Sequence, residues 1–76
     1  MKYRIVETIK GFYPQEKKNL LLKWKYLDKS NPSYTLGVAD AINTLSLVET
    51  YDKALEVIER RKQYIKDKNF RKIHNL

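Results

Sequence analysis

The chain contains no cysteine, only two glycines and a single histidine among its 76 residues. Because cysteine is absent, neither a disulfide bond nor a cysteine-ligated zinc ion can support the fold. The two glycines, Gly11 and Gly37, are too few for a glycine-rich loop that cradles phosphate groups. Stability must therefore come from side-chain packing, and six tyrosines, two phenylalanines and Trp24 are the largest side chains available for a core.

Long hydrophobic runs are also absent. The longest is Leu20–Leu22, whereas a membrane-spanning helix needs roughly 18 apolar residues. The first ten residues, "MKYRIVETIK", lack the apolar core of a signal peptide. We therefore expect a soluble cytoplasmic protein without membrane contacts, folded as one small domain over residues 1–76.

Acidic residues are too few to balance the basic ones. Sixteen Lys and Arg stand against nine Asp and Glu, which gives a net charge of +7. The segment from Arg60 onward contains seven basic residues and a single acidic one, Asp67, so its net charge is +6. Such an excess favours polyanionic partners, namely nucleic acid, an acidic protein surface or an anionic membrane.

Two strands joined by a turn are predicted at the N-terminus. In "KYRIVETIK", residues 2–10, β-branched and aromatic side chains alternate with a period of two. Gly11 supplies the turn, and "FYPQEKK" returns as the second strand. Pro14 cannot donate a backbone hydrogen bond, so we expect the second strand to lie at an edge of the sheet or to contain a bulge.

A third strand is predicted in "NLLLKWKYLDK", residues 19–29. Leu22, Trp24 and Tyr26 share one face there, and lysines alternate with them. The helical spacing of Leu20, Trp24 and Leu27 leaves a helix open as the alternative.

The segment from Asp28 to Gly37, "DKSNPSYTLG", has the composition of a loop. For the residues that follow, we expect a short helical turn at Val38–Ile42 and then a strand at Thr44–Glu49. One helix through both segments is the alternative interpretation.

A helix from about Tyr51 to Lys68 is the strongest prediction. Thr50 is a candidate N-cap, and Asp52 lies in the first turn, where the helix dipole favours an acid. The predicted core-facing stripe consists of Tyr51, Ala54, Leu55, Ile58 and Ile65. Residues 69–76 are expected to fray as a tail. These elements predict an α+β domain in which a three-stranded antiparallel sheet carries the C-terminal helix on one face, in the order β-β-β-α.

The sequence favours a protein that is not an enzyme. His74, the only histidine, lies near the C-terminus, where a general base would lack a fixed partner. Glu56 and Glu59 share a helix face but have no histidine or cysteine beside them, so we expect no metal site and no cofactor.

Nucleic-acid binding is the main functional prediction, because basic residues interleave with aromatic ones in "KKNLLLKWKY" and in "RRKQYIKDKNFRK". Lys and Arg neutralise phosphates, and exposed aromatic rings stack on unpaired bases. The candidate binding residues are Lys23, Lys25, Arg60, Arg61, Lys62, Lys66, Lys68, Arg71 and Lys72. The structural alternative is that Trp24 and Tyr26 are core or half-buried residues of a strand whose solvent face carries Lys23 and Lys25. In this alternative the Lys and Arg residues late in the helix complement its dipole.

The segments "KYRIVET", "GFYPQ", "LLKWKYL" and "TYDKALEVIER" together resemble small proteins encoded by phages and prophages of Bacteroidota-type bacteria. The resemblance implies a non-enzymatic accessory protein that works by binding, in the cytoplasm of the host cell. It is compatible with nucleic-acid binding through the basic C-terminal helix. It is equally compatible with a protein–protein interaction module, such as an inhibitor of a host enzyme or defence protein, or a virion component.

Overall fold

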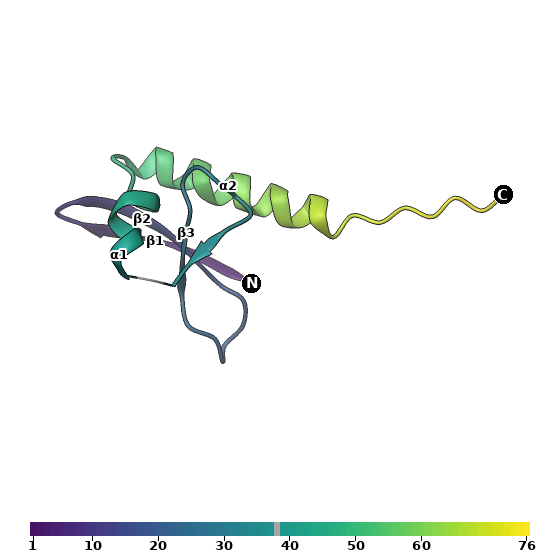
Figure 1. Ribbon diagram of the computed structural model, residues 1–76, viewed down its shortest axis with the longest axis horizontal. Helices are drawn as coiled ribbons and strands as arrows, with labels where there is room; N and C mark the ends of the chain where they lie inside the picture. Colours follow the sequence, from purple (N-terminus) through teal and green to yellow (C-terminus); the bar gives the residue numbers. More distant parts are fainter. Residues whose placement is uncertain (38) are drawn as a thin grey trace.

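The computed structural model describes residues 1–37 and 39–76. Its elements are β1 (Lys2–Thr8), β2 (Gly11–Lys17), β3 (Lys25–Leu27), β4 (Thr35–Leu36), α1 (Ala39–Leu45) and α2 (Tyr51–Lys68). The strands form one antiparallel sheet in the order β1-β2-β3-β4, and α2 runs along the sheet and continues beyond it (Figure 1). The predicted α+β class with a C-terminal helix is confirmed. Within the described residues, however, the sheet has four strands where three were predicted.

β1 and β2 form the predicted hairpin. Their register runs without a slip from Lys2 opposite Lys17 to Thr8 opposite Gly11. Gly11 has a backbone φ of +145°, which residues other than glycine rarely adopt. A Cβ added there would lie 2.6 Å from the backbone oxygen of Val48. Glycine is therefore required at this position both by its backbone conformation and by the close approach of the segment around Val48.

The expectation that Pro14 places β2 at an edge or in a bulge is wrong. β2 lies between β1 and β3, and its register with β1 is continuous through Pro14. Pro14 has no backbone N–H, and the strand tolerates this because an N–H at position 14 would point away from β1. The N–H of Phe12, two residues earlier, donates to Val48 on the side away from β1, and strand periodicity directs position 14 to that side as well. On that side of β2, Phe12 pairs with Val48 and the pairing with β3 begins only at Gln15, so Pro14 lies between the two partners.

β3 is shorter than the predicted third strand. It begins at Lys25, so Trp24 precedes it. The loop that follows is held by the Asp28 carboxylate, whose Oδ1 accepts hydrogen bonds from the backbone N–H groups of Ser30 and Asn31 at 2.8 and 3.0 Å. This loop was predicted correctly except at its end, where Thr35 and Leu36 pair with β3 as β4.

The strand predicted at Thr44–Glu49 is wrong. α1 extends from Ala39 to Leu45, and both Ser46 N–H and Leu47 N–H donate to the carbonyl oxygen of Ile42 at its end. Beyond α1, Val48 forms an isolated antiparallel bridge with Phe12. Of the helical turn predicted at Val38–Ile42, the first residue lies outside the described residues and the rest belongs to α1.

The helix predicted at Tyr51–Lys68 is confirmed as α2. Its N-cap is Thr50, whose side-chain oxygen accepts a hydrogen bond from Lys53 N–H at 3.1 Å. The buried residues of α2 are Ala54, Val57, Ile58 and Arg61. Tyr51 and Leu55, which were predicted to face the core, are 53% and 39% exposed. The buried stripe therefore includes a charged residue that a search for apolar side chains passes over.

The two sides of the sheet differ in what covers them. Register and strand alternation place Tyr3, Ile5, Phe12, Pro14 and Glu16 on the side that faces α2. The opposite side, called the open side below, carries Lys2, Arg4, Tyr13, Gln15 and Lys17. The core lies between the sheet and α2 and contains Leu27, Val48, Ala54, Val57 and Ile58. On the open side, α1 reaches Tyr13, whose hydroxyl donates to the Asn43 side chain.

Candidate nucleic-acid interface

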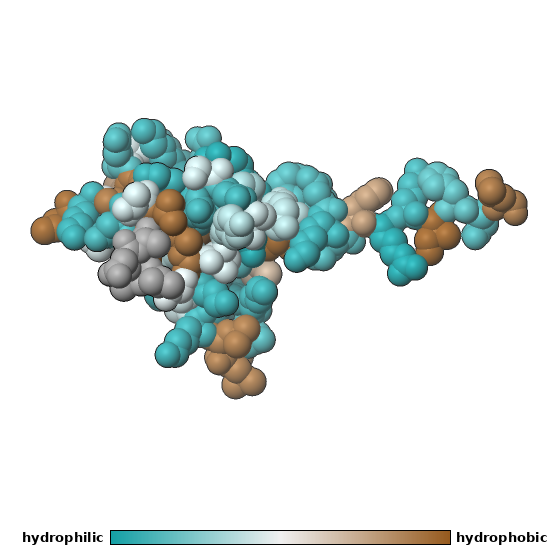
Figure 2. Space-filling view, viewed as in Figure 1, coloured by the Kyte–Doolittle hydropathy of each residue, from teal (hydrophilic) through white to brown (hydrophobic). Residues whose placement is uncertain are grey.

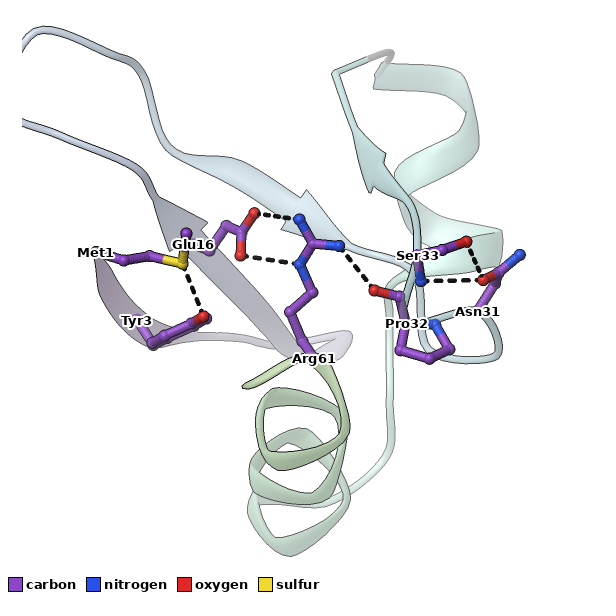
Figure 3. Close-up of polar contacts among 7 residues, drawn as sticks. All are labelled: Met1, Tyr3, Glu16, Asn31, Pro32, Ser33 and Arg61. Atoms are coloured by element: carbon purple, nitrogen blue, oxygen red, sulfur yellow. Dashed lines mark hydrogen bonds and ion pairs between the residues drawn. The ribbon is translucent and has the colours of Figure 1, made fainter. Parts of the chain in front are cut away.

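Arg61 and Glu16 form a buried ion pair between α2 and β2 (Figure 3). Arg61 Nε and Nη2 donate to the two carboxylate oxygens of Glu16 at 3.0 and 2.8 Å, and Nη1 donates to the carbonyl oxygen of Pro32 at 2.7 Å. The hydrogen bond from Arg61 to Glu16 raises the pKa of the guanidinium group. Burial raises the pKa of the Tyr3 phenol beside this pair, and the Glu16 charge raises it further.

Arg61, one of the candidate binding residues, therefore does not lie on the exposed face of α2. Its side chain is 9% exposed, and it joins a strand, a loop and a helix. A guanidinium group engaged in this way is not available to phosphates. We therefore remove Arg61 from the set of candidate contact residues, because its guanidinium group links α2 to β2 and to the loop at Pro32.

Arg60 and Lys62, on either side of Arg61, remain at the surface. Arg60 lies 3.7 Å from Glu56, and Lys62 lies 3.4 Å from Glu59. Exposed pairs of this kind contribute only about 0–1 kcal/mol, so a polyanion can compete for both cations. The two residues nevertheless point in different directions: Lys62 lies 5.2 Å from the centre of the Tyr3 ring in β1, whereas Arg60 lines a hollow near Lys29 and Lys53.

Further along α2, Lys66 follows Lys62 by four residues and shares its face. Lys68 lies seven residues after Arg61, which puts it on the same face of α2 as the buried stripe, but its own side chain is exposed. It lines a hollow of about 420 Å³ together with Tyr64 and with Met1 and Lys18 at the end of the β1-β2 hairpin. Arg71 and Lys72 lie in the exposed segment after α2 (Figure 1).

Trp24 lies against the open side of the sheet. The guanidinium carbon of Arg4 is 4.1 Å from the centre of the indole ring, and the ammonium nitrogen of Lys17 is 5.8 Å from it. Arg4 is itself held by a hydrogen bond of 2.6 Å from its Nε to the buried side chain of Gln15. Trp24 is half-buried, so it is neither a core residue nor a fully exposed ring.

A third hollow, of about 330 Å³, opens beside this ring. Its lining includes Met1, Lys2, Lys17, Lys18, Leu20 and Trp24. We call it the Trp24 hollow. The two lysines predicted as contacts in this part of the chain, Lys23 and Lys25, do not line the Trp24 hollow. Lys23 is exposed in the loop before β3. Lys25 lies opposite Glu16 in the pairing of β2 and β3, on the side of the sheet that faces α2.

The Trp24 hollow and the hollow at Lys68 share two lining residues. Met1 and Lys18 line both of them, so basic side chains continue from the open side of the sheet around the end of the hairpin to α2. We call this set the basic surface: Lys2, Arg4, Lys17, Lys18 and Lys68. Glu16, the acid next to Lys17 in the sequence, points to the opposite side of the sheet, where it pairs with Arg61. It therefore does not pair with the cations of the basic surface.

Lys2 and Arg4 are candidate interface residues that the sequence-based prediction did not include. They share one side of β1, and the hairpin register sets Lys2 opposite Lys17 and Arg4 opposite Gln15. The signal was the two-residue spacing of basic residues in a predicted strand. It became meaningful only when combined with the register of the return strand.

The predictions of no catalytic residue and no metal stay predictions. His74 is exposed in the C-terminal segment. Within residues 1–37 and 39–76, no group of three or more His, Cys, Asp or Glu side chains is arranged to hold a metal ion. No helix in that part of the chain has both the length and the apolar character required to cross a membrane.

Comparison with known proteins does not add to this picture. No protein-family model matches the chain, and no match is found among curated proteins or among solved structures. The resemblance to phage and prophage proteins therefore stays a prediction, and the geometry of the chain itself must carry any proposal about function.

Proposed function

We propose that the protein binds nucleic acid through the basic surface. The observation that carries this proposal is that Met1 and Lys18 line both hollows, so the cations around Trp24 on the sheet and Lys68 on α2 border neighbouring hollows. Scattered lysines would be the ordinary surface of a basic protein. A continuous row of cations matches the repeating charge of a phosphate backbone.

The proposed contacts differ from those predicted from the sequence. Lys2, Arg4, Lys17, Lys18 and Lys68 form the centre of the interface. Lys66, Arg71 and Lys72 extend it along α2 and the segment that follows, which projects away from the sheet (Figure 1). Lys23, Lys25, Arg60 and Lys62 are exposed cations that line neither hollow, and they add only to the general attraction of the protein for polyanions.

Binding of this kind requires no catalytic group and no cofactor. Each neutralised phosphate releases counterions, which makes affinity depend steeply on salt and little on base sequence. Together with the resemblance of the sequence to phage and prophage proteins, this leads us to propose a non-enzymatic accessory protein of phage type that acts in the cytoplasm.

The test is fluorescence anisotropy of a labelled oligonucleotide titrated with the protein at several salt concentrations. The proposal predicts that affinity falls steadily as salt rises, with a similar slope for oligonucleotides of different sequence. An affinity that is independent of salt, or no detectable binding at low salt, would refute it.

A second candidate function, binding of a protein partner, is favoured by one separate feature. The loop between β2 and β3 exposes Leu20 and Leu21 to 78% and 95%, and Figure 2 shows hydrophobic residues at the tip of the loop that projects below the sheet. Exposed apolar side chains that lie next to one another often mark a contact site. A partner captured from nuclease-treated lysate at high salt, and lost in a Leu20→Ser/Leu21→Ser variant, would favour this function over the first.

A further inference from the structure

The Trp24 hollow has a lining that phosphate binding alone does not explain. Lys2, Lys17 and Lys18 supply cations, but Met1, Leu20 and Trp24 contribute apolar surface. A phosphate group gains nothing from a thioether, an isobutyl group or an indole ring. We propose that this hollow takes an unpaired nucleobase, and hence that the protein prefers single-stranded to double-stranded nucleic acid. This inference rests on the proposed function and names the ligand class of the same site.

The chemistry of a single strand matches the hollow in both of its parts. An unpaired base offers a flat apolar face that stacks on an aromatic ring, and the phosphates on either side of it offer negative charge to surrounding cations. In a duplex the base faces are stacked on their neighbours, and only phosphates and groove edges are presented. The volume of about 330 Å³ is at the lower end of the range for small-ligand pockets, which suits one nucleotide and not a large ligand.

The ring that would receive the base is held in place before binding. Arg4 lies 4.1 Å from the indole centre, and its Nε is tied to Gln15, a residue only 4% exposed. Arg4 therefore packs on the ring, and Trp24 also lines the hollow in which we place the ligand. Because the ring is already positioned, stacking would cost little additional conformational entropy.

The apolar wall contributed by the loop is also positioned locally. Asn19 accepts a hydrogen bond from Leu21 N–H through its side-chain oxygen at 2.9 Å, and one from Leu22 N–H through its carbonyl oxygen at 3.2 Å. This turn places Leu20 at the hollow. The hollow is thus built from the start of the chain, the end of β2 and the turn after it, close to the cations of the hairpin end.

The experiment uses Trp24 as its own probe, because it is the only tryptophan in the chain. Three ligands of equal length are compared in low salt: a thymidine homopolymer, an abasic deoxyribose-phosphate strand and a DNA duplex. The inference predicts that the homopolymer changes Trp24 fluorescence and binds roughly 5- to 150-fold more tightly than the abasic strand, which corresponds to stacking of one base. The abasic strand and the duplex should bind through charge alone and leave the fluorescence nearly unchanged.

Two variants and a lipid control complete the test. Trp24→Ala should remove the preference for the homopolymer over the abasic strand, whereas Trp24→Phe should keep part of it, and circular dichroism checks that each variant is folded. If Trp24→Ala does not fold, the three-ligand comparison on the natural chain still decides. Equal affinities for all three ligands, or a Trp24 response to anionic lipid vesicles but not to the homopolymer, would overturn the inference. Binding of all three ligands that weakens with salt would leave the proposed function standing, whereas binding of none would overturn both.

Discussion

Replacing Arg61 by methionine should destabilise the protein more than any other exchange of a basic residue on α2. The substitution keeps an apolar stem of similar length but removes the three hydrogen bonds that the guanidinium group makes to Glu16 and Pro32. Glu16 is 1% exposed and would be left as a buried carboxylate without its cation. Breaking one partner of a buried pair costs about 3–5 kcal/mol.

That magnitude is large for a chain of this size. At roughly 0.05–0.15 kcal/mol per residue, a domain of 76 residues has a free energy of unfolding of about 4–11 kcal/mol. Arg61→Met should therefore remove a large share of the stability, and urea unfolding followed by circular dichroism measures the change. Arg60→Met is the matched control, because the neighbouring Arg60 makes only an exposed pair at 3.7 Å and should cost no more than about 1 kcal/mol.

A double variant separates the pair from its individual residues. Glu16→Met combined with Arg61→Met removes both charges at once, so no buried charge is left alone, and the double variant should be more stable than Arg61→Met alone. Equal costs for Arg61→Met and Arg60→Met would refute the reasoning. So would strictly additive costs at positions 16 and 61, because residues joined by two hydrogen bonds must be coupled.

Three further predictions concern the fold. Gly11→Ala should lower the free energy of unfolding by about 1–3 kcal/mol from its backbone conformation alone, whereas Gly37→Ala, where a Cβ meets nothing within 4 Å, should be nearly neutral in the same urea assay. Thr50→Ala should cost about 1 kcal/mol through loss of the N-cap of α2, and equal helix content and stability in the variant would contradict this. Burial raises the pKa of Tyr3 above its ordinary value of 10.0, so the unfolded chain releases this proton first and stability should fall as pH rises above 10.0. Tyr3→Phe should lose less stability over that interval, and identical pH profiles would argue against the burial of the phenol.

The parts of the fold that the sequence predicted correctly have local causes. Gly11 can adopt its backbone conformation whatever the rest of the chain does, and the cap at Thr50 with the helical periodicity after it defines α2 from within. β3 and β4 have three and two residues and are defined by pairing with each other and with β2. No local pattern distinguishes so short a strand from a loop, which is why β4 was taken as part of the Asp28 loop.

The candidate site shows the same limit. Arg60 and Arg61 are neighbours of the same type, and what distinguishes them is Glu16, which lies 45 residues from Arg61 in the sequence. The surplus of charge after Arg60 was therefore visible, but its division into a structural arginine and exposed cations was not. Lys2 and Arg4 lie opposite β2 in the hairpin, so their proximity to Trp24 depends on register and on the course of the loop that brings Trp24 back to the sheet.

The most direct test of the central claim compares the salt dependence of nucleic-acid affinity in two variants of equal net charge. The variant Lys17→Gln/Lys18→Gln removes two cations of the basic surface. The control variant Lys10→Gln/Lys53→Gln removes two cations elsewhere. Lys10 lies at the opposite end of the hairpin, and Lys53, in the first turn of α2, pairs with Glu49. Each phosphate contact contributes about 0.7 to the slope of log affinity against log salt for a single strand. We predict that the slope is shallower by about 1.4 in the first variant and unchanged in the second. Equal slopes in the two variants would contradict the claim that these cations form one binding surface.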